Sequence, residues 1–147
     1  MNEASKNYLK YWKVIRQYYK AKHKLSQAEL DVLLFMYSEN YFTRERFDRY
    51  NKILTWDLSR FDRMLKDGWF EIFRPKMGKK RTVYKMTGKG RHLVSDIYRK
   101  LNGEEIPTSN SYNPMFLRKV RYTHKVYKNM IIEMNEFIRQ QQRQSLE

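Results

Sequence analysis

The chain has 147 residues, a net charge of +15 and no cysteine, and 41% of its residues are hydrophobic. A sequence without cysteine excludes disulfides, thiolate catalysis, iron–sulfur clusters and zinc fingers. The length fits one domain or one compact unit of several layers. The positive charge favours a polyanionic partner, because each neutralised phosphate releases condensed counterions.

The positive charge is distributed unevenly along the chain. Residues 1–24 carry 7 basic and 1 acidic residues and residues 69–100 carry 10 and 2, whereas residues 25–68 carry 7 and 8. This pattern indicates a binding footprint, the alternative being the solvated surface of a lysine-rich protein. The longest apolar run, residues 32–37, is far shorter than the roughly 20 residues of a membrane span. With no secretory signal visible, we expect no membrane partner and a cytoplasmic location, nucleoid-associated or in the host of a phage.

Two helices are predicted in the first quarter of the chain. Residues 4–22 carry apolar side chains at 4-3-4 spacing, which is typical of a helix: Tyr8, Trp12, Ile15 and Tyr19. Ser26 and Glu29 have the spacing of a capping box, so a second helix begins there. Its apolar residues continue to Tyr37 on several faces, which predicts a central and mostly buried helix.

Two shorter helices are expected next. The first spans about 43–50 and opens with Thr43, and the second spans about 55–67 and opens with Thr55. Gly68 ends the second helix, as glycine commonly does at a helix C-terminus. The inward stripe of this helix is predicted to be Leu58, Phe61 and Leu65.

A change of period after Gly68 predicts a β-hairpin. Residues 69–74 are aromatic and β-branched, residues 75–80 are turn formers, and residues 81–86 form a second strand. Thr87 then caps a helix of about 88–102.

A polar loop, 103–113, precedes a long helix of about 115–141, and we expect residues 140–144 to be a frayed tail. The near-heptad apolar positions of the long helix are Phe116, Val120, Thr123, Tyr127, Met130, Met134 and Phe137.

This order of elements predicts a mainly α fold with a small β-hairpin wing. Residues 25–102 form a winged helix-turn-helix core, and helices 4–22 and 114–141 flank it as dimerisation elements in one compact unit.

The core also resembles the MarR (multiple antibiotic resistance regulator) family in five motifs. These are Leu25-Ser26 with the helix to Tyr37, Leu54-Thr55-Trp56-Asp57-Leu58-Ser59-Arg60, Lys66-Asp67-Gly68-Trp69-Phe70, Gly78-Lys79-Lys80-Arg81 and Met86-Thr87-Gly88-Lys89-Gly90. The chain departs from the family at the hairpin tip, which lacks the usual aspartate, and between Ser59 and Gly68, a segment one residue shorter than usual.

The predicted site binds double-stranded DNA. A recognition helix enters the major groove with its first turn, where an arginine can pair with guanine, and basic hairpin tips suit the minor groove and its phosphates. The predicted DNA-binding residues are Thr43, Arg44, Thr55, Trp56, Asp57, Ser59, Arg60, Arg63, Lys76, Lys79, Lys80 and Arg81. Three alternatives stay open: Trp56 as a packing residue, Asp57 as a helix-dipole residue, and the tip as a solvated hairpin.

The apolar stripes of residues 4–22 and 114–141 predict a homodimer, since a core of this size cannot cover them; intramolecular packing is the alternative. The MarR resemblance implies that the terminal helices interlock and that a small aromatic ligand can bind between them and the winged domain.

We predict no enzymatic activity, no cofactor and no metal site. His23, His92 and His124 are isolated, and Gly88-Lys89-Gly90 is too short for a phosphate-binding loop. The sequence therefore predicts a sequence-specific DNA-binding regulator that acts as a repressor. The alternatives are a phage or mobile-element assembly or structural protein, or a replication protein, that reuses the winged fold.

Overall fold

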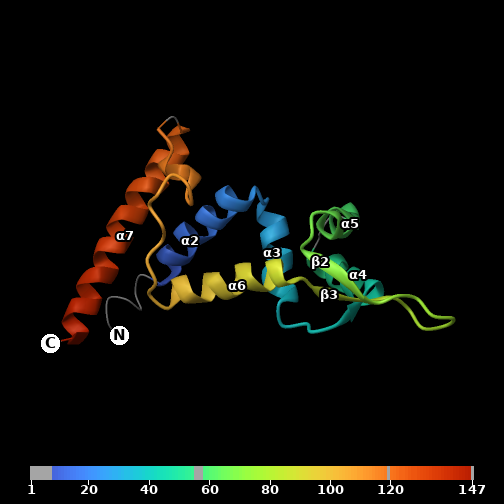
Figure 1. The fold of residues 1–147 in the computed structure, drawn as a ribbon. Helices are drawn as coiled ribbons and strands as arrows, with labels where there is room; N and C mark the ends of the chain where they lie inside the picture. The colour runs from blue at the N-terminus through green and yellow to red at the C-terminus, as the bar shows by residue number, and fades with distance from the viewer. Residues whose placement is uncertain (1–7, 55–57, 119, 147) are drawn as a thin grey trace. The chain divides into compact units, whose positions relative to one another are not determined.

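The structure is a computed structural model that describes residues 8–54, 58–118 and 120–146. Within these residues it has six α-helices and a small antiparallel sheet of three strands (Figure 1). The prediction of a mainly α fold with a small β element is confirmed.

Contacts divide the chain into two compact units, which we call the central unit (residues 26–95) and the terminal unit (residues up to 25 and from 96 onward). The division falls within helix α6 (Gly88–Leu101). From the sequence we place the end of the core at residue 102, directly after α6, whereas the contacts divide the chain seven residues earlier, after residue 95.

Local signals in the sequence set the limits of the central unit's elements. The unit contains α3 (Gln27–Met36), β1 (Phe42–Thr43), α4 (Arg44–Leu54), α5 (Leu58–Lys66), β2 (Phe70–Arg74), β3 (Val83–Met86) and the first part of α6. The capping box is present, since the Ser26 hydroxyl accepts a hydrogen bond from the Glu29 amide at 3.1 Å. Gly68 follows α5 with a φ of 85°, a conformation that glycine adopts without strain. Thr87 caps α6 by accepting from the Gly90 amide at 3.2 Å.

The sheet has the strand order β1-β3-β2, so the predicted hairpin gains a third strand. With two residues, β1 is too short to show an alternating pattern, and for this reason the sequence did not reveal it. The register shifts between Ile72 and Arg74, so Phe73 is the extra residue of a β-bulge. One face of the sheet packs on α5, where Phe61 contacts the rings of Phe42, Phe70 and Tyr84.

Two predictions about α4 need correction. Thr43 does not begin the helix but lies in β1, and its hydroxyl accepts a hydrogen bond from the Arg46 amide at 3.3 Å. It therefore caps the helix from the strand. The helix also extends to Leu54, past the predicted end at residue 50, while the predicted helix opening at Thr55 lies outside the described residues.

The terminal unit packs helix α2 (Tyr8–His23) on helix α7 (Tyr122–Leu146), with the 3₁₀ helix η1 (Pro114–Phe116) beside both. Ile15, Tyr19 and Met134 are buried within this one chain. The expectation that they need a partner subunit to cover them is therefore wrong for these three. The homodimer itself stays a prediction.

The long C-terminal helix begins later and ends later than the sequence predicts. Asn113 caps the short η1 turn by accepting from the Met115 amide at 3.0 Å, and Leu117 is extended, so the chain is not helical there. Helix α7 begins at Tyr122 and continues to Leu146. The predicted frayed tail is thus helical, and Gln142 donates to the Gly103 carbonyl at 3.4 Å.

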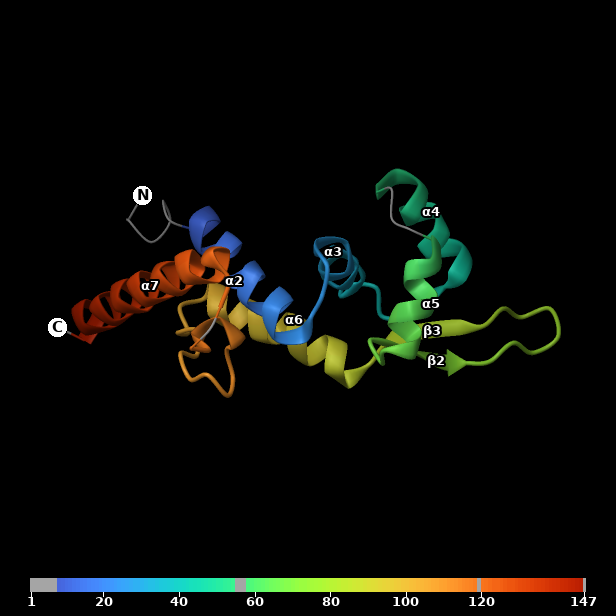
Figure 2. The same ribbon diagram turned by 90° about the horizontal axis from the view of Figure 1, so that it is seen from above.

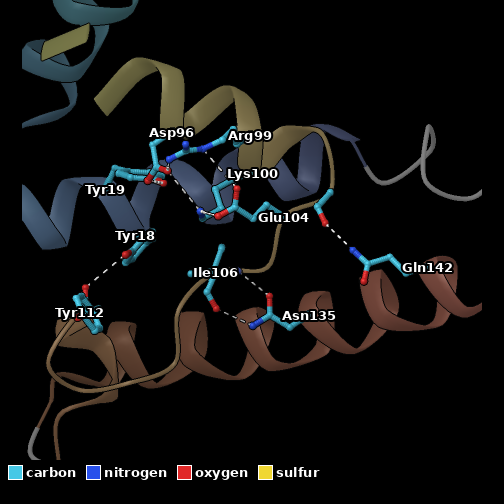
Figure 3. A network of polar contacts seen from close by, with 11 residues as sticks. Tyr18, Tyr19, Asp96, Arg99, Lys100, Glu104, Ile106, Tyr112, Asn135 and Gln142 are labelled. Carbon is cyan, nitrogen blue, oxygen red and sulfur yellow. Dashed lines mark hydrogen bonds and ion pairs between the residues drawn. The ribbon is translucent and has the colours of Figure 1, made fainter. Parts of the chain in front are cut away.

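A polar network fixes the loop that precedes η1 (Figure 3). The buried Asn135 side chain accepts from the Ile106 amide at 2.9 Å and donates to the Ile106 carbonyl at 2.8 Å. The buried Lys100 ammonium lies 2.8 Å from Glu104 and 3.6 Å from Asp96. Burial and the Asp96 carboxylate raise the pKa of Tyr19, which donates its hydroxyl hydrogen to Asp96.

Candidate nucleic-acid interface

The tip of the β2–β3 hairpin carries an exposed group of cations. The Met77 and Lys80 backbones bond reciprocally, at 3.0 and 2.9 Å, around Gly78, which has a φ of 59°. The tight turn exposes Lys76, Lys79 and Lys80, as predicted, together with Arg74, which the prediction missed. None of these four cations forms an ion pair within the described part of the chain. We call them the hairpin-tip cations; Figure 2 shows the hairpin extending beyond α5.

Arg81, the fourth cation predicted for the hairpin, is placed differently. Its guanidinium forms an ion pair with Glu45 of α4. Glu45 also lies 3.7 Å from Arg49. The open groove between α4 and β3, which has a volume of about 870 Å³, is therefore lined by charges of both signs. This mixture makes the groove a weaker site for a polyanion than the hairpin-tip cations.

Arg44 joins α4 to α5. Its guanidinium lies over the Phe61 ring, 2.8 Å from Asp62 and 3.3 Å from Asp48. Burial on its own would lower the pKa of Arg44, but the hydrogen bonds and charges of Asp62 and Asp48 more than offset this, so the pKa is raised. These contacts give Arg44 a structural role, beside any contact with DNA.

Arg60 points toward the start of α3. Its Nη1 atom donates to the Ser26 hydroxyl at 3.0 Å, and its buried Nε atom has no partner among the described residues. The Ser26 hydroxyl thus accepts from both the Glu29 amide and Arg60. To bond a DNA base, Arg60 would first have to break its hydrogen bond to Ser26, so its guanidinium is not free to contact DNA in this structure.

The exposed face of α5 offers different cations. Phe61 and Met64 are buried, while Arg63 and Lys66, one turn apart, are exposed. Arg63 was predicted and Lys66 was not, although its spacing from Phe61 and Met64 places it on the outer face. Ser59 lies in the first turn of α5, and the predicted residues Thr55, Trp56 and Asp57 lie outside the described residues.

No family model, curated protein or solved structure gives a significant match to this chain. The resemblance to the MarR family therefore rests on the sequence motifs alone. Within residues 8–54, 58–118 and 120–146, no three His, Asp or Glu side chains are grouped to hold a metal ion. No helix in that part of the chain combines the length and the hydropathy that a membrane crossing requires.

Proposed function

We propose that the central unit is a winged helix-turn-helix domain that binds double-stranded DNA, in a MarR-like transcriptional regulator acting as a repressor. The observation that carries the proposal is the order α3-β1-α4-α5-β2-β3-α6 with unpaired cations at the tip of its hairpin. Helix α5 would enter the major groove and the hairpin would reach the adjacent minor groove.

The geometry of α5 favours Arg63 and Lys66 for the contacts in the major groove. Both are exposed on the face opposite the buried Phe61 and Met64. The hairpin-tip cations would supply affinity that does not depend on sequence, because phosphates are the same at every base pair. Arg60 then holds α5 against α3 through Ser26, and Arg44 holds α5 against α4 through Asp62.

The regulator is proposed to be a homodimer held by α2 and α7. Apolar side chains stay exposed on these helices, with Leu9 at 79%, Tyr122 at 80% and Ile132 at 47%. A twofold partner would cover them and would place two copies of α5 roughly 34 Å apart, one turn of DNA. Light scattering tests the dimer, since a particle of the 18.3 kDa chain mass contradicts it.

A small aromatic ligand belongs to the same proposal. The terminal unit has an open cavity of about 140 Å³ between α2 and α7, lined by Tyr11, Val14, Met130 and Phe137 and by the charged Lys10 and Glu133. It lies between the two terminal helices themselves, not between them and the winged domain as the MarR resemblance implies. A cavity of about 150 Å³ is large enough for one benzene ring, so the volume suits a ligand of one aromatic ring.

The salt dependence of duplex binding tests the proposal. Each phosphate contact contributes roughly 0.9 to the slope of log affinity against log salt. Replacing Lys79 and Lys80 by alanine should therefore lower the slope by roughly 1–2 units. The control replaces Lys13 and Lys125, exposed lysines of the terminal unit, and removes the same charge.

Equal slopes for the two double variants would show that the hairpin tip does not meet DNA. If the wild-type protein binds duplex DNA weakly and without sequence preference, the alternative functions are favoured, namely a phage or mobile-element assembly protein or a replication protein.

A further inference from the structure

The β-sheet of the central unit has a second face, opposite the one that packs on α5. Lys85 pairs with Glu71, and Arg74 pairs with Val83, two residues from Lys85, so Glu71, Arg74 and Lys85 lie on the same face. The bulge adds Phe73 to this face, where its ring is 5.7 Å from the Lys85 ammonium and 4.3 Å from the Tyr41 ring. We call this surface the outer sheet face.

Two aromatic rings on the outer sheet face are about half exposed to solvent. Tyr41 is 52% exposed and Phe73 is 51% exposed, although their rings touch at an angle of 34°. The core does not require them, because Phe42, Phe70 and Tyr84 already fill the inner face against α5. The pair therefore presents ring surface to solvent, which a ligand with flat aromatic faces can cover.

The charges around the ring pair are complementary to an anion. Lys85 lies beside Phe73 with its charge partly balanced by Glu71 at 3.4 Å, and Arg74 is exposed on the same face. The other three hairpin-tip cations, Lys76, Lys79 and Lys80, lie in the turn that connects the two strands. Exposed rings beside a line of cations are the two components of a single-strand binding surface, where bases stack and phosphates follow the charge.

We propose that the outer sheet face binds single-stranded DNA, with one base stacked on the Tyr41–Phe73 pair and the phosphates of the strand on the hairpin-tip cations. A duplex cannot use the ring pair in this way, because its bases are stacked inside the helix. An acidic peptide would use the cations but has no need of the ring surface. The choice of DNA over RNA rests on the proposed function, which already brings DNA to this hairpin.

The test measures binding of the full chain to a labelled oligothymidylate of about 15 nucleotides by fluorescence anisotropy. The comparison ligand is an abasic oligomer of the same length and charge. We expect the wild-type protein to prefer the oligothymidylate by about tenfold. This comparison needs no variant and so does not depend on whether a variant folds.

Variants locate the preference on the ring pair. Phe73→Leu keeps an apolar side chain but removes the ring, and it should weaken oligothymidylate binding by about fivefold or more. Phe73→Trp should restore it. The matched control is Met77→Leu, which changes a residue of the same hairpin that is 61% exposed and has no ring. Duplex binding should be the same in all these proteins.

Equal wild-type affinity for the oligothymidylate and the abasic oligomer would overturn the inference. So would a Phe73→Leu loss of equal size on duplex and single strand, which would make the ring pair a support of the hairpin. Displacement by oligoglutamate as readily as by unlabelled oligothymidylate would show recognition by charge alone and would also overturn it. If the wild-type protein binds no duplex but still prefers the oligothymidylate to the abasic oligomer, only the proposed function is refuted.

Discussion

Replacing Asn135 by alanine should destabilise the protein by about 2–4 kcal/mol. The Asn135 side chain bonds both the amide and the carbonyl of Ile106, at 2.9 and 2.8 Å, and both residues are buried (Figure 3). A buried polar group left without a partner costs about 1–3 kcal/mol, and the variant leaves two such groups. Urea unfolding followed by tryptophan fluorescence measures the loss.

The matched control is Asn110→Ala, which changes an exposed asparagine of the same loop and should cost less than about 0.5 kcal/mol. Amide hydrogen exchange gives a second readout, since the Ile106 amide should exchange faster in Asn135→Ala than in the wild-type protein. A loss below about 0.5 kcal/mol, together with unchanged exchange at Ile106, would refute the reasoning.

Three further changes have defined outcomes. Gly90→Ala should destabilise by about 1–3 kcal/mol, because its Cβ would lie 2.6 Å from the Met86 side chain, whereas Gly88→Ala meets open space and should not; thermal melts that coincide would contradict this. Burial on its own would raise the pKa of Asp96, but its hydrogen bonds and the nearby positive charges lower the pKa by more, so it lies below the ordinary value. Its stabilisation is present above about pH 4 and is lost as pH falls through the lowered pKa; Asp96→Asn should remove this loss from an acid titration of stability, and an unchanged titration would refute the assignment. Arg60→Ala should cost about 1 kcal/mol of stability and little DNA affinity, and the reverse result would make Arg60 a base reader.

The elements that the sequence predicted well are those with local signals. The capping box at Ser26, the glycine after α5 and the threonine before α6 each act within three residues of their partners. Such contacts are readable from spacing alone. The hairpin and its exposed lysines were predicted for the same reason, since turn formers and strand formers alternate there.

The parts that the sequence did not predict depend on partners far along the chain. Arg44 contacts Asp62, 18 residues away, and Arg60 contacts Ser26, 34 residues away. Both arginines look available in the sequence and are partly occupied in the fold. The Asn135 bonds to Ile106 span 29 residues. The heptad pattern continues back to Phe116 in η1 although Leu117 is extended, so it did not reveal that α7 begins only at Tyr122.

The proposal of duplex binding by the central unit is tested most directly by amide hydrogen exchange on the full chain with a duplex selected from a random pool. We expect slowed exchange in α5 and at residues 74–81, with the duplex bound far more tightly than unselected DNA. Slowed exchange confined to α2 and α7, or a pool from which no duplex is enriched, would contradict the proposal.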